Sequence, residues 1–159
     1  MVAVSILIPA AERSLTMAVL ALRSAGARSF ALAQSKIVNV DAFQWQWRFT
    51  YLRHDVTIVG TPGNPPTLVL PAGETTRIVL RADDVVHAFY VSDFLFQRQA
   101  IPGVVNTFDF TVPKPGRWPG QCSLYCGLDH TSMTFTVQAL SPAAFNQWLS
   151  DHSLSGAGT

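Results

Sequence analysis

The chain has 159 residues, of which 48% are hydrophobic, so it is long enough to form one domain with a substantial core. Only 13% of the residues are charged, against about 25% in an average soluble domain. This favours a surface that is partly covered by a partner or lies near a membrane. The net charge of +1 and the scattered Lys and Arg residues exclude the basic stripe of a nucleic-acid-binding protein.

Residues 1–35 contain two apolar runs, 2–11 and 15–22, which are separated by Glu12 and Arg13. Each run is about half as long as the ~20 residues needed to cross a bilayer. The part of this segment after Glu12 is free of acidic residues and contains Arg and Ser, as mitochondrial targeting segments do. We expect a helical N-terminal extension, either a degenerate membrane span or a targeting segment, with an ordinary helix as the third alternative.

From Lys36 onward the hydrophobic period becomes that of a β-sheet. Aromatic residues occupy alternate positions from Phe43 to Tyr51, with polar residues between them, which predicts one half-buried strand. Many short strands separated by turns predict an antiparallel sandwich or barrel. The further strand candidates are 67–70, 75–81, 85–91, 104–112, 116–122 and 133–139.

A short C-terminal helix is predicted after Ser141, which is a suitable N-cap residue followed by a proline at the first helical position. Phe145, Trp148 and Leu149 give this helix one apolar face. The residues from 153 to 159 are small and mostly polar, so a flexible tail is expected there. The main domain is then expected to span residues 36–152.

The most informative stretch runs from Cys122 to Met133 and holds both cysteines, one histidine and one methionine. Thiolate, imidazole and thioether ligands together suit copper better than magnesium or calcium. With His87 upstream on an apolar strand, the residues Cys126, His130 and Met133 complete a blue-copper set. One loop wraps three of these side chains around a point, and the upstream strand supplies the fourth.

Cys122 adds a second thiolate, and two thiolates can bridge two copper ions. Several alternatives stay open on the residues alone. A mononuclear blue-copper carrier would use Cys126 as its single cysteine ligand. A copper-delivery protein would bind copper without redox turnover. Zinc also binds Cys₂His₂ sets, although it has no use for the thioether of Met133. Taken singly, His87 and Met133 are more often ordinary core residues, and two cysteines at this spacing are compatible with buried thiols or a strained disulfide.

Several motifs in this chain are similar to those of a single family. The copper-type loop opens with Gly120-Gln-Cys122, as it does in that family. Together these motifs resemble the dinuclear copper (CuA) domain of cytochrome c oxidase subunit II, over roughly residues 36–149. The other matching motifs are Gln44-Trp-Gln-Trp47, Asp84-Val-Val-His87-Ala-Phe89 and Ala100-Ile-Pro-Gly-Val-Val-Asn106.

The resemblance implies an all-β, cupredoxin-like Greek-key sandwich or barrel with two copper ions. Cys122 and Cys126 would bridge the two ions, and one histidine would bind each. Met133 would be a weak ligand, and Leu124 would offer its backbone carbonyl. The two histidines of this implied set are His87 and His130, and Trp45 is the residue through which electrons would arrive.

As a function, the resemblance implies an electron-transfer subunit of a membrane-bound cytochrome c oxidase. It would accept electrons from cytochrome c and pass them to haem in subunit I, without reducing oxygen itself. The copper domain would lie on the outer face, either on the bacterial periplasmic side or in the mitochondrial intermembrane space. The related CuA domain of nitrous oxide reductase is disfavoured, because Gln44-Trp-Gln-Trp47 resembles the oxidase motif.

Two positions depart from the family pattern. Leu124 stands where the family usually has a glutamate, whose carboxylate helps to hold magnesium against subunit I, so the magnesium site is in doubt. Gln99 stands where the family often has an aspartate. A remaining hypothesis is an acidic docking patch for a basic cytochrome, made of Asp83, Asp84, Asp93 and Asp129.

Overall fold

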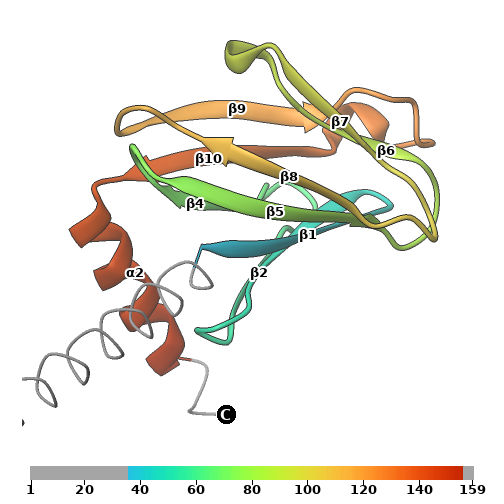
Figure 1. The fold of residues 1–159 in the computed structure, drawn as a ribbon. Helices are drawn as coiled ribbons and strands as arrows, with labels where there is room; N and C mark the ends of the chain where they lie inside the picture. The colour runs from blue at the N-terminus through green and yellow to red at the C-terminus, as the bar shows by residue number, and fades with distance from the viewer. Residues whose placement is uncertain (1–35, 156–159) are drawn as a thin grey trace, which may run out of the picture. The chain divides into compact units, whose positions relative to one another are not determined.

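The computed structural model describes residues 36–155, so the expectations for residues 1–35 lie outside the described part of the chain. Within it, the strands form two five-stranded sheets that face each other (Figure 1). The first sheet has the order β3 (Val56–Val59), β2 (Gln46–Tyr51), β1 (Ile37–Phe43), β5 (Thr75–Ala82), β8 (Asn106–Thr111). The second has the order β4 (Thr67–Pro71), β10 (Thr134–Leu140), β9 (Gly116–Cys122), β6 (His87–Val91), β7 (Phe96–Ala100).

The prediction of an all-β domain with a short C-terminal helix is confirmed. Helix α2 (Pro142–Ser155) follows β10, and the hydroxyl of Ser141 accepts from the backbone N–H of Ala144 at 3.3 Å, as an N-cap residue does. The helix includes residues 153–155, which belong to the segment for which a flexible tail is expected. The sheets are mixed rather than purely antiparallel, because β1 pairs with β5 and β4 pairs with β10 in parallel.

The expected single strand from Phe43 to Tyr51 is wrong. β1 ends at Phe43, a turn follows at Gln44 and Trp45 with a cis peptide bond between them, and β2 begins at Gln46. Phe43 pairs with Gln46 across the hairpin, so these two side chains share the outer face. An alternating pattern that continues through a two-residue turn looks like one strand, which is why the periodicity missed the hairpin.

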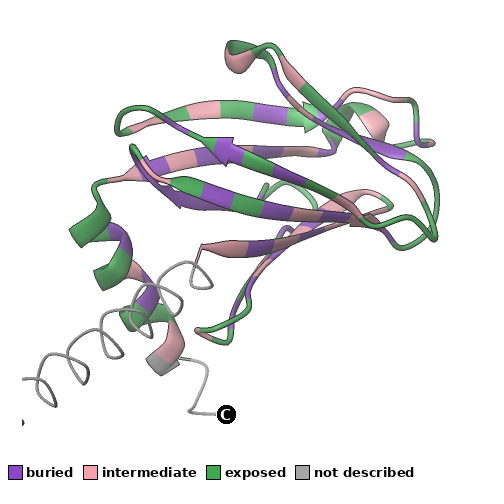
Figure 2. Ribbon diagram, viewed as in Figure 1, coloured by how far each residue is buried: buried purple, intermediate pink, exposed green. Residues whose placement is uncertain are grey.

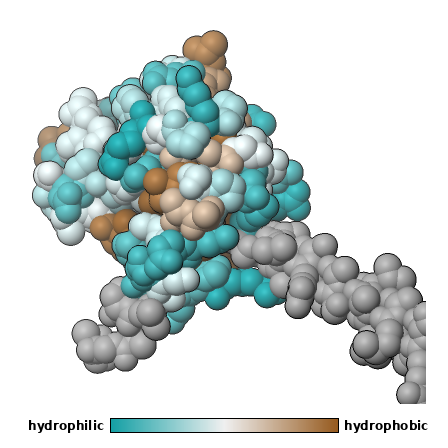
Figure 3. Space-filling view, turned by 90° about the vertical axis from the view of Figure 1, so that its left-hand side faces the viewer, coloured by the Kyte–Doolittle hydropathy of each residue, from teal (hydrophilic) through white to brown (hydrophobic). Residues whose placement is uncertain are grey.

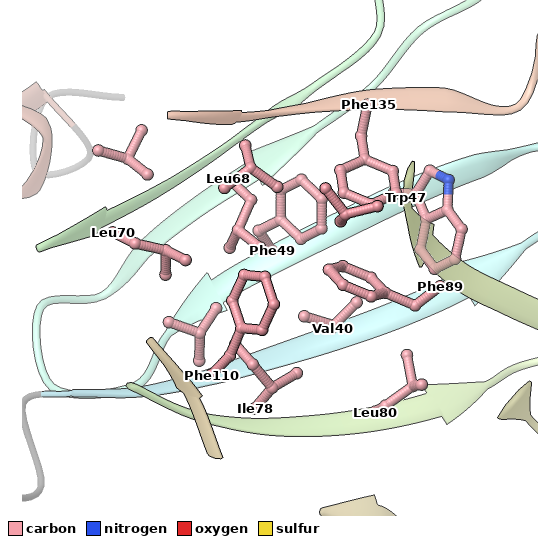
Figure 4. Packing of buried hydrophobic residues seen from close by; sticks show 14 of the residues in the cluster. Val40, Trp47, Phe49, Leu68, Leu70, Ile78, Leu80, Phe89, Phe110 and Phe135 are labelled. Carbon is pink, nitrogen blue, oxygen red and sulfur yellow. The ribbon is translucent and has the colours of Figure 1, made fainter. Parts of the chain in front are cut away.

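The core lies between the two sheets and is rich in aromatic rings (Figure 4). Burial alternates along β1, β2 and β10, as expected for strands with one face toward the core (Figure 2). Phe135 on β10 stacks on Phe89 of β6 at 4.7 Å between ring centroids, and it meets Trp47 of β2 at 5.2 Å. The first contact lies within one sheet, and the second joins the two sheets.

Strand directions bring five connections to one end of the sandwich, on the right in Figure 1. We call this the loop end; its connections are 44–45, 60–66, 83–86, 101–105 and 123–133. The opposite end carries the 92–95 turn and α2, whose Trp148 packs against Tyr51 with ring centroids 5.0 Å apart. On the face seen in Figure 3, apolar residues form small patches among hydrophilic ones. None of the helices in the described range is long and apolar enough to span a membrane.

Candidate metal centre

The sheet register places the first two predicted ligands side by side. His87 begins β6 and Cys122 ends β9, and these antiparallel neighbours pair through Phe89 and Cys122. The backbone N–H of Cys122 also donates to the carbonyl of Met133 at 2.9 Å, which closes the base of the 123–133 loop. Two strand ends and one loop base therefore converge on the same buried point.

All of the side chains predicted as ligands meet at this point. Cys122 Sγ lies 3.8 Å from Cys126 Sγ and 3.9 Å from His87 Nδ1. Cys126 Sγ lies 3.5 Å from His130 Nδ1 and 3.8 Å from Met133 Sδ. The ligand atoms of His87, Cys122 and Cys126 are all within 4.8 Å of one another, and both thiols are free.

The loop itself has a compact local structure. His130–Ser132 form a short 3₁₀ turn, in which the N–H of Met133 donates to the carbonyl of His130. His130 begins this turn and Met133 directly follows it, so the turn sets the spacing between the imidazole and the thioether. Leu124 directs its carbonyl toward the centre, at 3.2 Å from Cys122 Sγ. The carbonyl expected from the sequence is therefore in reach, although the leucine side chain offers no oxygen.

Asp84 fixes the orientation of the His87 ring. Its Oδ1 lies 2.8 Å from His87 Nε2, which leaves Nδ1 facing the thiols. A carboxylate on the outer nitrogen is a common partner of metal-binding histidines because it sets the tautomer and the ring orientation. Burial opposes the charge on Asp84, but hydrogen bonds from His87 and two backbone N–H groups outweigh it and lower the pKa of this carboxyl.

The two thiols titrate differently because only one can easily be charged. Burial raises the pKa of Cys122, but hydrogen bonds with His87 and nearby backbone groups outweigh this and lower it below the ordinary thiol value. Burial and the negative charge on Cys122 raise the pKa of Cys126 above that value. For the His87 imidazole, burial by itself lowers the pKa. Contacts with Cys122 and Asp84 outweigh burial, so the pKa of His87 is raised. A cation between the thiols would stabilise both as thiolates.

Two residues outside the predicted ligand set also contact the centre, which the hydrophobic periodicity of the sequence did not indicate. Gln44 Nε2 and Trp45 Nε1 both donate to the carbonyl of Cys126, at 2.8 and 3.2 Å. The Gln-Trp motif marks these two residues in the sequence, but it does not indicate that Cys126 is their partner. The geometry thus places Trp45 beside a predicted ligand, as the hypothesis of electron uptake requires.

The four carboxylates of the expected acidic docking patch do not all lie at one end of the sandwich. Asp93 lies in the 92–94 turn at the opposite end of the sandwich from Asp129. Asp83 is paired with Arg48 at 2.9 Å, and Asp84 is engaged with His87. Strand direction therefore separates Asp93 from the other three carboxylates, which lie in loop-end connections.

The sequence and the fold are both similar to those of a known protein family. Residues 64–140 match the family model for the periplasmic domain of cytochrome c oxidase subunit II. The probable cytochrome c oxidase subunit 2 of Streptomyces avermitilis is 36% identical over 152 residues, and that of Nocardia farcinica is 40% identical over 109 residues. The described domain belongs to the cytochrome c oxidase subunit II family. The two alignments cover 72% and 64% of this chain, which spans about half the length of the Streptomyces relative (48%) and 29% of the Nocardia relative.

Solved structures of subunit II domains share the fold. The crystal structure of the periplasmic domain of CoxB from Bradyrhizobium japonicum has a TM-score of 0.69 and 25% sequence identity, covering 75% of this chain and 94% of that chain. A second structure is the mixed disulfide intermediate between thioredoxin-like TlpAs and CoxB, with a TM-score of 0.66 and 26% identity, covering 77% and 94%. The expected cupredoxin-like architecture is confirmed.

Proposed function

We propose that this subunit II domain holds two copper ions and carries electrons in a cytochrome c oxidase. Cys122, Cys126, His87 and His130 would hold the ions, and Met133 and the carbonyl of Leu124 would be weaker ligands. Copper supplies one-electron chemistry at this site. The domain accepts electrons from cytochrome c and delivers them to haem in subunit I.

One observation supports two ions rather than one: each of the two thiols has its own histidine and one further donor atom beside it. Beside Cys122 lie an imidazole nitrogen and a carbonyl oxygen, and beside Cys126 lie an imidazole nitrogen and a thioether sulfur. A single blue-copper ion uses two histidines, one cysteine and one weak axial ligand, which leaves one thiol without a role. The alternative, a mononuclear blue-copper carrier, therefore accounts for less of the geometry.

The residues of the chain have distinct tasks in this proposal. The two strands β6 and β9 hold His87 and Cys122 side by side, and Asp84 keeps the His87 ring turned toward the thiols. Burial of both cysteines keeps water away from the thiolates. Because CoxB forms a mixed disulfide with a thioredoxin-like protein, we further propose that Cys122 and Cys126 must be reduced before the metal is bound.

Magnesium is not part of the proposal. Leu124 has only its backbone carbonyl to offer, so this position does not fit the carboxylate ligand that the family resemblance implies. We place the domain on the outer side of the membrane, as the periplasmic family model suggests, in contact with subunit I.

The test is to load the reduced chain with copper, count the metal, and record the EPR hyperfine pattern. We expect two copper ions per chain and one unpaired electron shared by two nuclei. Cys122→Ser should abolish this shared pattern, whereas Ser123→Ala in the same loop should leave it unchanged. A single localised copper in the wild-type protein, or identical spectra for wild type and Cys122→Ser, would contradict the proposal.

A further inference from the structure

The turn between β1 and β2 contacts both sides of the metal centre. On one side, Gln44 Nε2 and Trp45 Nε1 donate to the carbonyl of Cys126. On the other, the backbone N–H of Gln44 donates to Asp84 Oδ2 at 2.6 Å, while Oδ1 of the same carboxylate holds His87 Nε2. Gln44 is therefore bonded to the main chain of one predicted ligand and, through one carboxylate, to the ring of another.

Gly127 provides a separate observation that the loop is shaped to receive this turn. A Cβ atom at Gly127 would lie 3.0 Å from Gln44 Nε2 and 3.1 Å from Trp45 Nε1. These distances are tighter than ordinary contacts, so a side chain here would push both donors away from the Cys126 carbonyl. The φ angle of Gly127, 122°, also lies in the region that favours glycine.

Trp45 also borders the surface on its other side. A hollow of about 630 Å³ is lined by Trp45, Gln46 and Asp129, among others. The indole thus borders this hollow and also contacts the carbonyl of a predicted ligand. Its side chain is half-buried and packs against the core, and its nitrogen is held by the hydrogen bond to Cys126.

We propose that Gln44 is a positioning residue that fixes the Trp45 indole against the Cys126 carbonyl, anchored through its own backbone to the Asp84 carboxylate that holds His87. This inference rests on the proposed electron-transfer function and takes Trp45 as the point of electron uptake, as the family resemblance implies. Gln44 does not touch the metal or the donor. It acts by holding the Trp45 contact through which an electron reaches Cys126.

The first experiment uses the full chain without metal, in its reduced form. Hydrogen exchange of the Trp45 indole N–H is measured by NMR in wild type, Gln44→Leu and Gln46→Leu. Gln46→Leu is the matched control, because it makes the same chemical change on the same hairpin and beside the same hollow. In Gln44→Leu the turn loses the Gln44 bond to the shared Cys126 carbonyl and is held there by the indole N–H alone. If that bond has ordinary strength, indole exchange should speed up about fivefold, with no such change in Gln46→Leu.

Gly127→Ala is a second variant that displaces the turn without altering Gln44. It should also speed indole exchange, whereas Gly73→Ala, another glycine with positive φ but open space around it, should not. Equal exchange rates in wild type and Gln44→Leu would overturn the inference. If Gln44→Leu does not fold, unchanged exchange in Gly127→Ala would overturn it instead.

The second experiment uses the copper-loaded chain. Gln44→Leu should keep the copper count and EPR pattern of wild type, but reduced cytochrome c should reduce it several-fold more slowly than Gln46→Leu. If wild type fails to bind two copper ions, the proposed function fails while the indole result still stands. If wild type loads normally and the two glutamine variants are reduced at the same rate, only the positioning role fails.

Discussion

At the scale of single residues, Met133 combines a core position with a proposed ligand position. Its side chain is fully buried, and its Sδ lies 3.8 Å from Cys126 Sγ. A buried methionine is usually explained by packing alone. The contact with the thiol, directly before the start of β10, indicates a second role that packing does not require.

We expect Met133→Leu to change the reduction potential of the loaded centre more than the stability of the fold. The two side chains have similar volumes, so the change should cost less than about 1.5 kcal/mol of unfolding free energy. The axial ligand tunes the potential of copper sites. Redox titration and denaturant unfolding of the metal-free protein check both parts; an unchanged potential would argue against ligation by Met133.

At the scale of elements, Tyr51 joins the two sheets by hydrogen bonds as well as by packing. Its hydroxyl accepts from the N–H of Val69 at 2.7 Å and donates to the carbonyl of Val69 at 2.9 Å, which ties β2 to β4. Burial raises the pKa of the Tyr51 phenol, although the bond with Val69 opposes the shift. The hydroxyl therefore stays protonated, and remains a donor, at neutral pH.

Tyr51→Phe should destabilise the metal-free protein by about 1–3 kcal/mol, because two buried backbone groups of Val69 lose their partner. Tyr125→Phe removes the same atom from a side chain that is 82% exposed, and should change stability by no more than about 0.5 kcal/mol. Urea unfolding of the two variants gives the comparison. Equal effects would mean that the Tyr51 bonds contribute little.

At the scale of the whole molecule, large exposed apolar side chains gather at the loop end. Among the described residues, six of them lie in loops there, close to the metal centre in sequence or space. Of the carboxylates at this end, Asp83 and Asp84 are already bonded to Arg48 and His87. This distribution favours a partner that contacts the loop end through apolar surface. The six residues are Val85, Val86, Val104, Val105, Tyr125 and Leu128.

Leu128→Gln should weaken binding to detergent-solubilised subunit I without changing the copper count. Leu128 is 85% exposed at the loop end, and Leu95 is 90% exposed at the other end, so Leu95→Gln is a matched control. Pull-down of subunit I by each copper-loaded variant provides the measurement. Equal losses for both variants, or none for either, would mean that the loop end is not the contact surface.

The sequence by itself was enough to identify the ligand types, their order and the all-β class. Ligand chemistry depends on which side chains are present. The Cys122–Met133 loop is short, so its side chains must lie close together. The alternation of buried and exposed residues likewise follows from the two-residue period of a strand.

Tertiary structure decided the features that depend on contacts between distant segments. The hairpin at Gln44 and Trp45, the bonds of these residues to Cys126 and the hydrogen bond of Asp84 to His87 arise only when β1, β6 and β9 meet at one end. Strand direction also separated Asp93 from the other carboxylates of the expected acidic patch. Such features depend on strand register and on which strand ends lie together. The hydrophobic pattern along the sequence specifies neither of these.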